Sequence, residues 1–170
     1  MRSLSLICLF FGLVWAQTTP SGEEGSTESD IAFSPFIVTD GKYALGTFAK
    51  VNWYQAQATC ASYGYTLVSI TTESDQRAVR NFLYTRGNAQ LPLLDAPLWT
   101  SGTDLANADT WIWFSNGRTF TYRNFQNGLS YYPSSSRNCL AVYAITGAWV
   151  NEECSEQRYF VCEKRCLFED

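Results

Sequence analysis

The first apolar residues that recur at helical spacing are Trp53, Ala56 and Cys60, which fall on one side of a helix. Asn52 precedes them and can cap the helix, with Gln55 three residues later as its reciprocal capping partner. The pattern therefore predicts a helix that begins at Trp53 and carries a cysteine on its buried face.

A second helical pattern begins after Thr72, a residue type that caps helices well. The first turn holds two acidic side chains, which are favourable at the positive end of the helix dipole. Val79, Phe82 and Leu83 form the apolar stripe, and Gly87 is a suitable stop. We expect a helix between Thr72 and Gly87 that packs one face on the core.

Shorter apolar runs predict strands. They cover residues 42–45, 66–70, 98–102, 140–145 and 158–162. Residues 110–122 hold Asn116-Gly117 between alternating runs, which is the strongest short-range signal for a β-hairpin. Residues 123–137 are polar and rich in Gly, Pro and Ser, so they indicate a long loop of the kind that is usually functional or disordered. Two early helices followed by strands and loops predict an α+β fold.

The start of the chain has the plan of a secretory signal peptide over residues 1–16, with a positive start, an apolar run and a small residue before the cleavage point. The apolar run is too short to span a bilayer, although a membrane anchor is the alternative. Residues 17–35 are typical of an acidic Ser/Thr/Gly tether, residues 36–163 of a folded domain, and residues 164–170 of a tail. We expect a secreted, extracellular protein without membrane insertion.

Composition and charge exclude several functions. The 170 residues include no histidine, which removes the Ser-His-Asp triad, the Cys-His pair and His-ligated metal sites. The net charge of −4 argues against nucleic acid as a partner, because phosphates require a basic face. Glu152 and Glu153 form a paired carboxylate, but sequence neighbours usually point apart and no nucleophile with an activating base accompanies them. We therefore predict that the protein is not an enzyme.

Aromatic residues make up 16% of the chain, which is enough for a substantial core. Tryptophans at strand or helix spacing are more often buried than exposed. We expect five of them in the core: Trp53, Trp99, Trp111, Trp113 and Trp149.

Removal of the signal peptide takes away Cys8 and leaves five cysteines. They are Cys60, Cys139, Cys154, Cys162 and Cys166. In an oxidising compartment four can pair and one is left over, and the sequence permits several pairings. A Cys60–Cys162 bond would tie the two ends of the domain together, and a Cys139–Cys154 bond would close a loop of about 15 residues. We interpret Cys166 as the odd thiol, which forms an interchain disulfide in a homodimer or else stays free or capped.

Several motifs follow one another in order along the chain. They are Trp53 with Ala56 and Cys60, Leu67–Ile70, Trp99–Asp104, Asn138-Cys139-Leu140, Trp149–Cys154 and Tyr159–Glu163. This series resembles the C-type lectin-like domain over residues 36–163, and its 99–102 motif is most similar to invertebrate members. The resemblance implies a disulfide-stapled fold of two helices, two small antiparallel sheets and a long loop. It also implies the pairings Cys60–Cys162 and Cys139–Cys154.

Members of that family that bind sugar through calcium carry oxygen ligands in three places: a Glu-Pro-Asn or Gln-Pro-Asp triplet in the long loop, a Glu before an Asn-Cys pair, and a Trp-Asn-Asp triplet. Here these places hold Leu129-Ser130-Tyr131, Arg137 and Trp149-Val150-Asn151. Ca²⁺ requires several hard oxygen ligands, whereas Leu and Val offer none and Arg137 repels a cation. We predict no usual calcium site and no cofactor. Other oxygen-bearing side chains form either a weaker, different calcium site or solvated surface: Asp104, Asp109, Asn151, Glu152 and Glu153.

The same loop offers other binding chemistry. Tyr131 and Tyr132 suit protein contact or stacking on a sugar face, unless one of them packs under the loop. Arg137 has a surface ion pair with Glu152 or Glu153 as its alternative role. We predict a secreted recognition module that binds a glycan or a cell-surface or matrix protein without the usual calcium site, and the alternative is an ordinary calcium-dependent lectin. The predicted ligand-binding residues are Asn127, Tyr131, Tyr132, Arg137, Asn138, Asn151 and Glu152.

Overall fold

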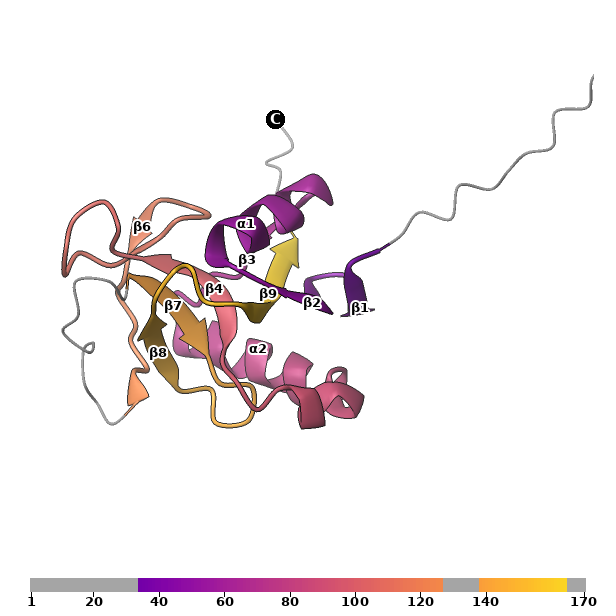
Figure 1. The fold of residues 1–170 in the computed structure, drawn as a ribbon. Coiled ribbons are helices and arrows are strands. Elements are labelled where there is room, and N and C mark those ends of the chain that lie inside the picture. Colours follow the sequence, from indigo (N-terminus) through magenta and orange to yellow (C-terminus); the bar gives the residue numbers. More distant parts are fainter. Residues whose placement is uncertain (1–33, 127–137, 165–170) are drawn as a thin grey trace, which may run out of the picture. The chain divides into compact units, whose positions relative to one another are not determined.

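The structure is a computed structural model that describes residues 34–126 and 138–164 (Figure 1). The predicted signal peptide and nearly all of the tether lie outside these residues. The elements in chain order are β1 (Phe36–Thr39), β2 (Tyr43–Val51), α1 (Trp53–Ser62), β3 (Tyr65–Leu67), α2 (Glu73–Thr85), the 3₁₀ helix η1 (Asn88–Leu93), β4 (Leu98–Thr103), β5 (Ile112–Trp113), β6 (Arg118–Thr119), β7 (Cys139–Val142), β8 (Trp149–Glu152) and β9 (Arg158–Lys164).

Both predicted helices form, and both begin with the expected capping box. The Asn52 side chain accepts a hydrogen bond from the backbone N–H of Gln55 at 2.9 Å, and the Gln55 side chain accepts one from the N–H of Asn52 at 3.1 Å. Thr72 and Asp75 exchange the same pair of bonds at the start of α2. Each box satisfies donors that a helix start leaves without partners, which explains why the sequence places both starts correctly.

Strand β9 is the hub of the sheet. It pairs antiparallel with β2 and β3, and it pairs parallel with β4 where Trp99 faces Phe160. On the far side, β4 pairs antiparallel with β5 and β7, and β7 pairs with β8. The two antiparallel sheets expected from the resemblance are therefore present, and the parallel pairing of β4 with β9 joins them into one mixed sheet. The family fold implied by the sequence is confirmed.

The sequence pattern misses β1, β8 and η1, and it places some strand ends incorrectly. β8 is buried at its first three positions, so it shows none of the polar alternation that marks a half-exposed strand. β1 has only four residues. The predicted strand 66–70 ends at Leu67, and the predicted strand 140–145 ends at Val142. The predicted hairpin forms as β5 and β6, with Gly117 at a positive φ of 70°.

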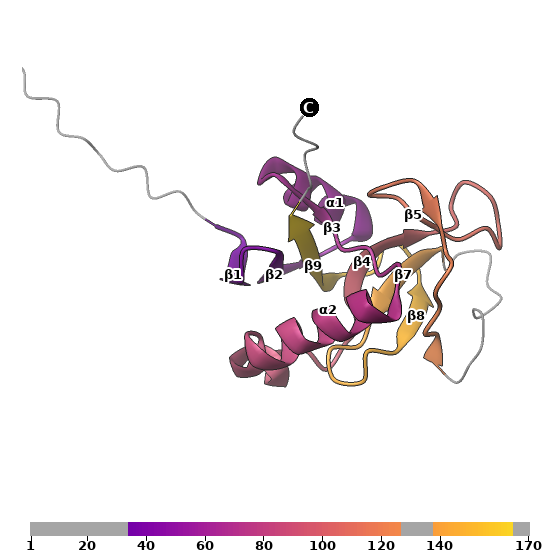
Figure 2. The ribbon, with the colours of Figure 1, turned by 180° about the vertical axis from the view of Figure 1, so that it is seen from behind.

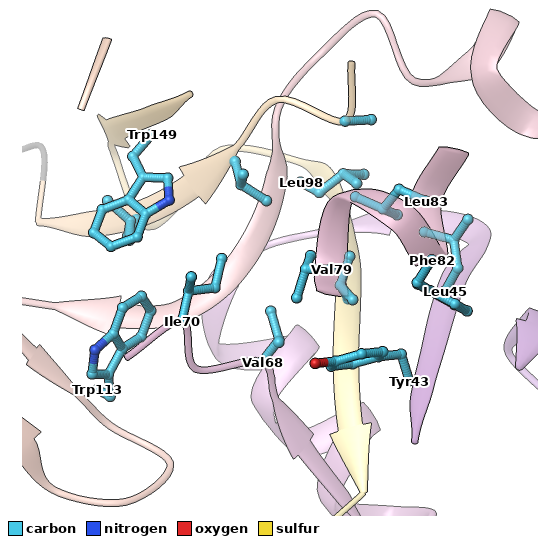
Figure 3. Close-up of a cluster of buried hydrophobic side chains, with 14 of the residues drawn as sticks. Tyr43, Leu45, Val68, Ile70, Val79, Phe82, Leu83, Leu98, Trp113 and Trp149 are labelled. Carbon is cyan, nitrogen blue, oxygen red and sulfur yellow. The ribbon is translucent and has the colours of Figure 1, made fainter. Parts of the chain in front are cut away.

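The two helices cover opposite faces of the sheet (Figure 2). Because successive strand residues point to opposite faces, Leu45 and Val161 pack under α2, whereas Ala44 and Cys162 pack under α1. Figure 3 shows the α2 side, with Trp113 and Trp149 together at one end of this cluster. The five tryptophans expected in the core are buried, each at 2% exposure or less: Trp53, Trp99, Trp111, Trp113 and Trp149.

Two disulfides close the fold, and both match the pairings implied by the resemblance. Cys60–Cys162 joins α1 to β9, and Cys139–Cys154 joins β7 to the turn after β8. They span 102 and 15 residues of sequence. In the chain-entropy model such bonds stabilise a fold by about 5 and about 3 kcal/mol. Cys166 lies outside the described residues, so the disulfide-linked homodimer stays a prediction.

The carboxylate of Asp75 makes the stability of the domain depend on pH. Burial alone would raise its pKa, but hydrogen bonds from the hydroxyl and N–H groups of Thr71 and Thr72 lower that pKa overall, below its ordinary value of 3.8. A lowered folded-state pKa adds stability above the unfolded-state pKa and removes it as the pH falls through the folded-state pKa.

We therefore expect Asp75→Asn to lower the free energy of unfolding by about 1 kcal/mol at neutral pH, a loss typical of a helix cap. The difference from the wild type should shrink as the pH falls below 3.8. Urea unfolding followed by circular dichroism across this range measures it. Glu73→Gln is the control, because its exposed ion pair with Arg77 contributes little. A pH-independent loss for Asp75→Asn would contradict the assignment.

Candidate functional site

The structure describes the two ends of the predicted binding loop. Four predicted ligand-binding residues lie outside the described part of the chain: Asn127, Tyr131, Tyr132 and Arg137. Asn138, Asn151 and Glu152 lie within it, on the outgoing end of the loop and on β8. The geometry of the loop's base is therefore the observable part of the site.

The incoming end of the loop is fixed to β8. Phe125 forms an isolated parallel β-bridge with Trp149, and the backbone N–H of Trp149 donates to the carbonyl of Asn124 at 2.8 Å. The Asn124 side chain donates in turn to the carbonyl of Gly147 at 2.8 Å. Backbone and side-chain bonds thus hold the first residues of the loop against the sheet.

The outgoing end of the loop is fixed through Asp104. The Asn138 side chain donates to this carboxylate at 2.8 Å, and the backbone N–H of Asp109 donates to its other oxygen at 3.1 Å. The Asn138 carbonyl accepts from the Thr103 hydroxyl at 2.7 Å and from the Asp104 N–H at 3.2 Å. Asp104 is 4% exposed, so its expected place on the solvated surface is wrong. A buried carboxylate needs such donors, and Asp104 uses them to join β4 to the end of the loop.

The two predicted site residues on β8 are mostly enclosed. Asn151 is fully buried, and Val150 before it packs in the core cluster under α1. The Glu152 carboxylate lies 3.2 Å from the Arg158 guanidinium, and the two side chains are only 20% and 14% exposed. Arg158 also lies over the Trp99 ring, with 5.8 Å between the guanidinium carbon and the ring centroid. This end of β8 therefore presents one ion-paired carboxylate, that of Glu152, rather than a row of exposed oxygen donors.

A block of aromatic rings underlies the loop's base. The Trp149 indole N–H donates to the Gln76 side chain at 2.7 Å, and the Gln76 amide donates to the Gly147 carbonyl at 3.0 Å. Rings pack edge-on around Trp149 with centroids 5.5–5.6 Å away. These rings belong to Trp113, Phe120, Tyr122 and Phe125. Such pairs add specific contact energy to the burial of the rings, so the base is rigid.

Sequence reasoning missed Gln76, although the sequence carried a signal for it. Gln76 occupies the position one turn before Val79 on the apolar stripe of α2, and it is 4% exposed. A polar residue at a stripe position is buried and requires partners, which Trp149 and Gly147 supply.

Glu163 is a half-buried group that the sequence analysis did not single out. Burial raises the pKa of its carboxyl, while hydrogen bonds from Ser69 act in the opposite direction. The backbone N–H of Ser69 donates to this carboxylate at 2.9 Å. The Ser69 hydroxyl also contacts those of Ser101 and Ser115. Glu163 thus holds the segment after β3 against β9, which is a structural role.

Residues 34–126 and 138–164 contain no group of three or more His, Cys, Asp or Glu side chains placed to hold a metal ion. In the same residues no helix is both long enough and apolar enough to cross a membrane.

Comparison with known proteins decides the family. The model of the lectin C-type domain matches residues 49–164, which is most of the chain. The chain belongs to the C-type lectin domain family. It is 33% identical to C-type lectin 37Da of Drosophila melanogaster over 95 residues, which are 56% of this chain and 48% of that protein. It is 28% identical to the human C-type mannose receptor 2 over 129 residues, which are 75% of this chain and 8% of that receptor.

The fold of this lectin-type domain also occurs in a solved structure described as a calcium-independent type II antifreeze protein. The two superpose with a TM-score of 0.58 at 20% identity, covering 76% of this chain and 92% of the other. This likeness concerns the fold alone. The chain spans about half the length of the Drosophila relative and less than a tenth of the receptor, so its similarity to them is that of one domain.

We predict that Gln76→Ala lowers the free energy of unfolding by about 2–3 kcal/mol, because it leaves the buried Trp149 indole N–H without an acceptor. Ser74→Ala, on the exposed side of the same helix, is the control and should change stability by less than about 0.5 kcal/mol. Denaturant unfolding of both variants measures the difference. Equal stability of the two would show that the bond does not anchor Trp149.

Proposed function

We propose that this lectin-type domain is a secreted recognition module that binds a carbohydrate or protein ligand at the loop of residues 123–138 without the usual calcium site. A glycan or a cell-surface or matrix protein is the expected partner. The observation that carries this proposal is the combination of an intact family scaffold with loss of oxygen donors at the positions where calcium-binding members hold the ion.

Loss of the calcium ligands is supported from both sides of the loop. Val150 and Asn151 stand where calcium-binding members have an Asn-Asp pair; Val150 offers only hydrocarbon and Asn151 is fully buried. Asp104 is committed to Asn138 and to the Asp109 N–H. Arg137 places a positive charge where the family motif has a glutamate, and like charges at close range repel by several kcal/mol at about 4 Å and an intermediate dielectric. These residues do not fit the family's calcium site.

Ligand binding at the loop is supported by the way its ends are held. Phe125 is bridged to Trp149, and Asn138 is bonded to Asp104, so the loop starts and ends on fixed elements. Binding loops on rigid scaffolds lose less conformational freedom on complex formation. Tyr131 and Tyr132 supply contact area at a low entropy cost, and Arg137 supplies a charged donor.

The test of ligand binding combines the double variant Tyr131→Ala/Tyr132→Ala with a glycan array and a screen of cell-surface proteins. We expect this variant to lose ligand capture while its melting temperature stays nearly unchanged. Tyr54→Ala is the matched control, because Tyr54 is a 55% exposed tyrosine on α1 and is not part of the loop. If the double variant lost ligand capture and also melted at a clearly lower temperature, the two tyrosines would be assigned to packing instead.

Calcium dependence is tested separately by calorimetric titration of the folded protein and by repeating the array with EDTA. We expect no micromolar calcium binding and no effect of EDTA on ligand capture. Strong, EDTA-sensitive sugar binding would overturn the proposal in favour of an ordinary calcium-dependent lectin.

A further inference from the structure

α2 lies beside the turn between β7 and β8 (Figure 2). Side chains of the outer face of α2 and of this turn line a second candidate site. It is an open pocket of about 240 Å³. Its lining residues are Arg77, Arg80, Asn81, Tyr84, Ala144 and Ile145. The four helix residues follow the spacing that places side chains on one face of a helix, and all four are exposed. None of them belongs to the loop proposed above as the ligand-binding site.

Arg80 is held in place before any ligand arrives. Its side-chain stem crosses Gly147 so closely that a Cβ there would lie 2.4 Å from the Arg80 Cδ. Gly147 also has a positive φ of 73°, so glycine is required here on two grounds. One terminal nitrogen of the guanidinium donates to the Ile145 carbonyl at 3.2 Å. An exposed arginine usually moves through many rotamers, and this anchoring removes much of that freedom.

The anchored guanidinium keeps free donors. Arginine has five N–H groups, and among the described residues Arg80 engages only the Ile145 carbonyl. Its remaining edge suits the paired oxygens of a carboxylate or a sulfate, which guanidinium groups bind through two parallel bonds. Arg77 adds a second guanidinium, held to Glu73 at 2.7 Å by an exposed and therefore weak ion pair.

Charge around the pocket is positive although the chain as a whole is acidic. From Gln76 to the end of α2 and its cap, the helix carries three arginines and no acidic residue. Arg77 and Arg80 line the pocket, whereas Arg86 lies outside it. The turn from Tyr143 to Ala148 carries no charged side chain. Glu73 in the first turn of α2 pairs with Arg77 and offsets its charge, so the attraction of an anionic group to this face comes mainly from Arg80.

Tyr84 completes the site with an apolar, hydrogen-bonding surface. Its side chain is 64% exposed one turn after Arg80, and Ile145 opposite is 61% exposed. The Tyr84 ring, the Arg80 guanidinium and the Asn81 amide together match a sugar that carries a negative group. The Tyr84 ring covers the C–H face of the sugar, and the nitrogen donors bind its anionic group and its hydroxyls. The pocket is smaller than the roughly 300–1,000 Å³ that holds drug-sized ligands, so it accommodates a single sugar unit.

We propose that this pocket is a second binding site, specific for a carboxylated or sulfated sugar unit of an acidic glycan, with the anchored Arg80 guanidinium as the residue that binds the anion. No residue that lines this pocket belongs to the 123–138 loop. Each proposal can therefore fail its own test without affecting the other.

The experiment measures binding of three probes to the full-length mature protein by calorimetry: a heparin-derived oligosaccharide, an unsulfated oligohyaluronate and a neutral maltooligosaccharide. We expect at least one acidic probe to bind and the neutral one to bind much more weakly. Preference between the two acidic probes distinguishes sulfate from carboxylate. Binding should weaken with added salt. The double variant Tyr131→Ala/Tyr132→Ala should retain it, which separates this site from the loop.

Variants locate the site. Arg80→Gln should weaken binding by about tenfold, because it removes a charged two-bond contact. Arg86→Gln is the matched control: it removes the same charge from the same helix outside the pocket and should change affinity by less than about twofold. Tyr84→Ala should weaken binding by about fivefold. Because the Tyr84 ring is exposed, this substitution should not unfold the domain, so the loss of affinity would come from the pocket itself. Melting temperatures accompany each measurement.

Two results would overturn the proposal. The first is equal loss in Arg80→Gln and Arg86→Gln, which would show general charge attraction rather than a site. The second is failure of both acidic probes to bind better than the neutral one. If Arg80→Gln proves unstable, the Tyr84→Ala measurement decides: unchanged affinity in that variant would also exclude the pocket.

Discussion

The hydrogen bond between the Trp149 indole and Gln76 joins the parts of this domain that bear on binding. It fastens β8 to α2, and through the Gln76 amide it also fixes the turn at Gly147. Trp149 bridges Phe125 at the start of the long loop, and the Gly147 turn carries the stem of Arg80. A polar pair inside an aromatic core therefore sets the position of both candidate binding surfaces. Because a buried polar pair tolerates little change in geometry, it specifies one arrangement of these elements.

Much of the fold was predictable because the decisive signals are local. Asn52 with Gln55 and Thr72 with Asp75 are short-range capping pairs, and Asn116-Gly117 is a turn that needs no distant partner. The elements that the sequence missed depend on tertiary contacts instead. β8 is recognisable only by its pairing with β7, and the extent of β2 up to Val51 follows from its pairing with β9. Propensity alone carries no information about such pairings.

The sequence could name candidate site residues but not their surroundings. Asn138, Asn151 and Glu152 were predicted to bind ligand, yet burial of Asn151 and the pairing of Glu152 with Arg158 arise from neighbours distant in sequence. Asp104 looked like a surface acid because its donors come from Asn138 and Asp109, across a turn and a strand pair. The anchoring of Arg80 is also invisible in sequence, since it depends on a glycine 67 positions later. Contacts of this kind appear only once the chain is folded.

The pairing of β2 with β9 has a consequence for how such a domain is reused. β2 lies between the first and the last strands that the structure describes, because it pairs with β1 on one side and with β9 on the other. A domain whose first and last strands lie so near each other can be inserted into a host protein, or repeated in tandem, while the host chain keeps its path. Pulling on the flanking segments would load β1 and β9 first, and the Cys60–Cys162 bond would keep β9 tied to α1.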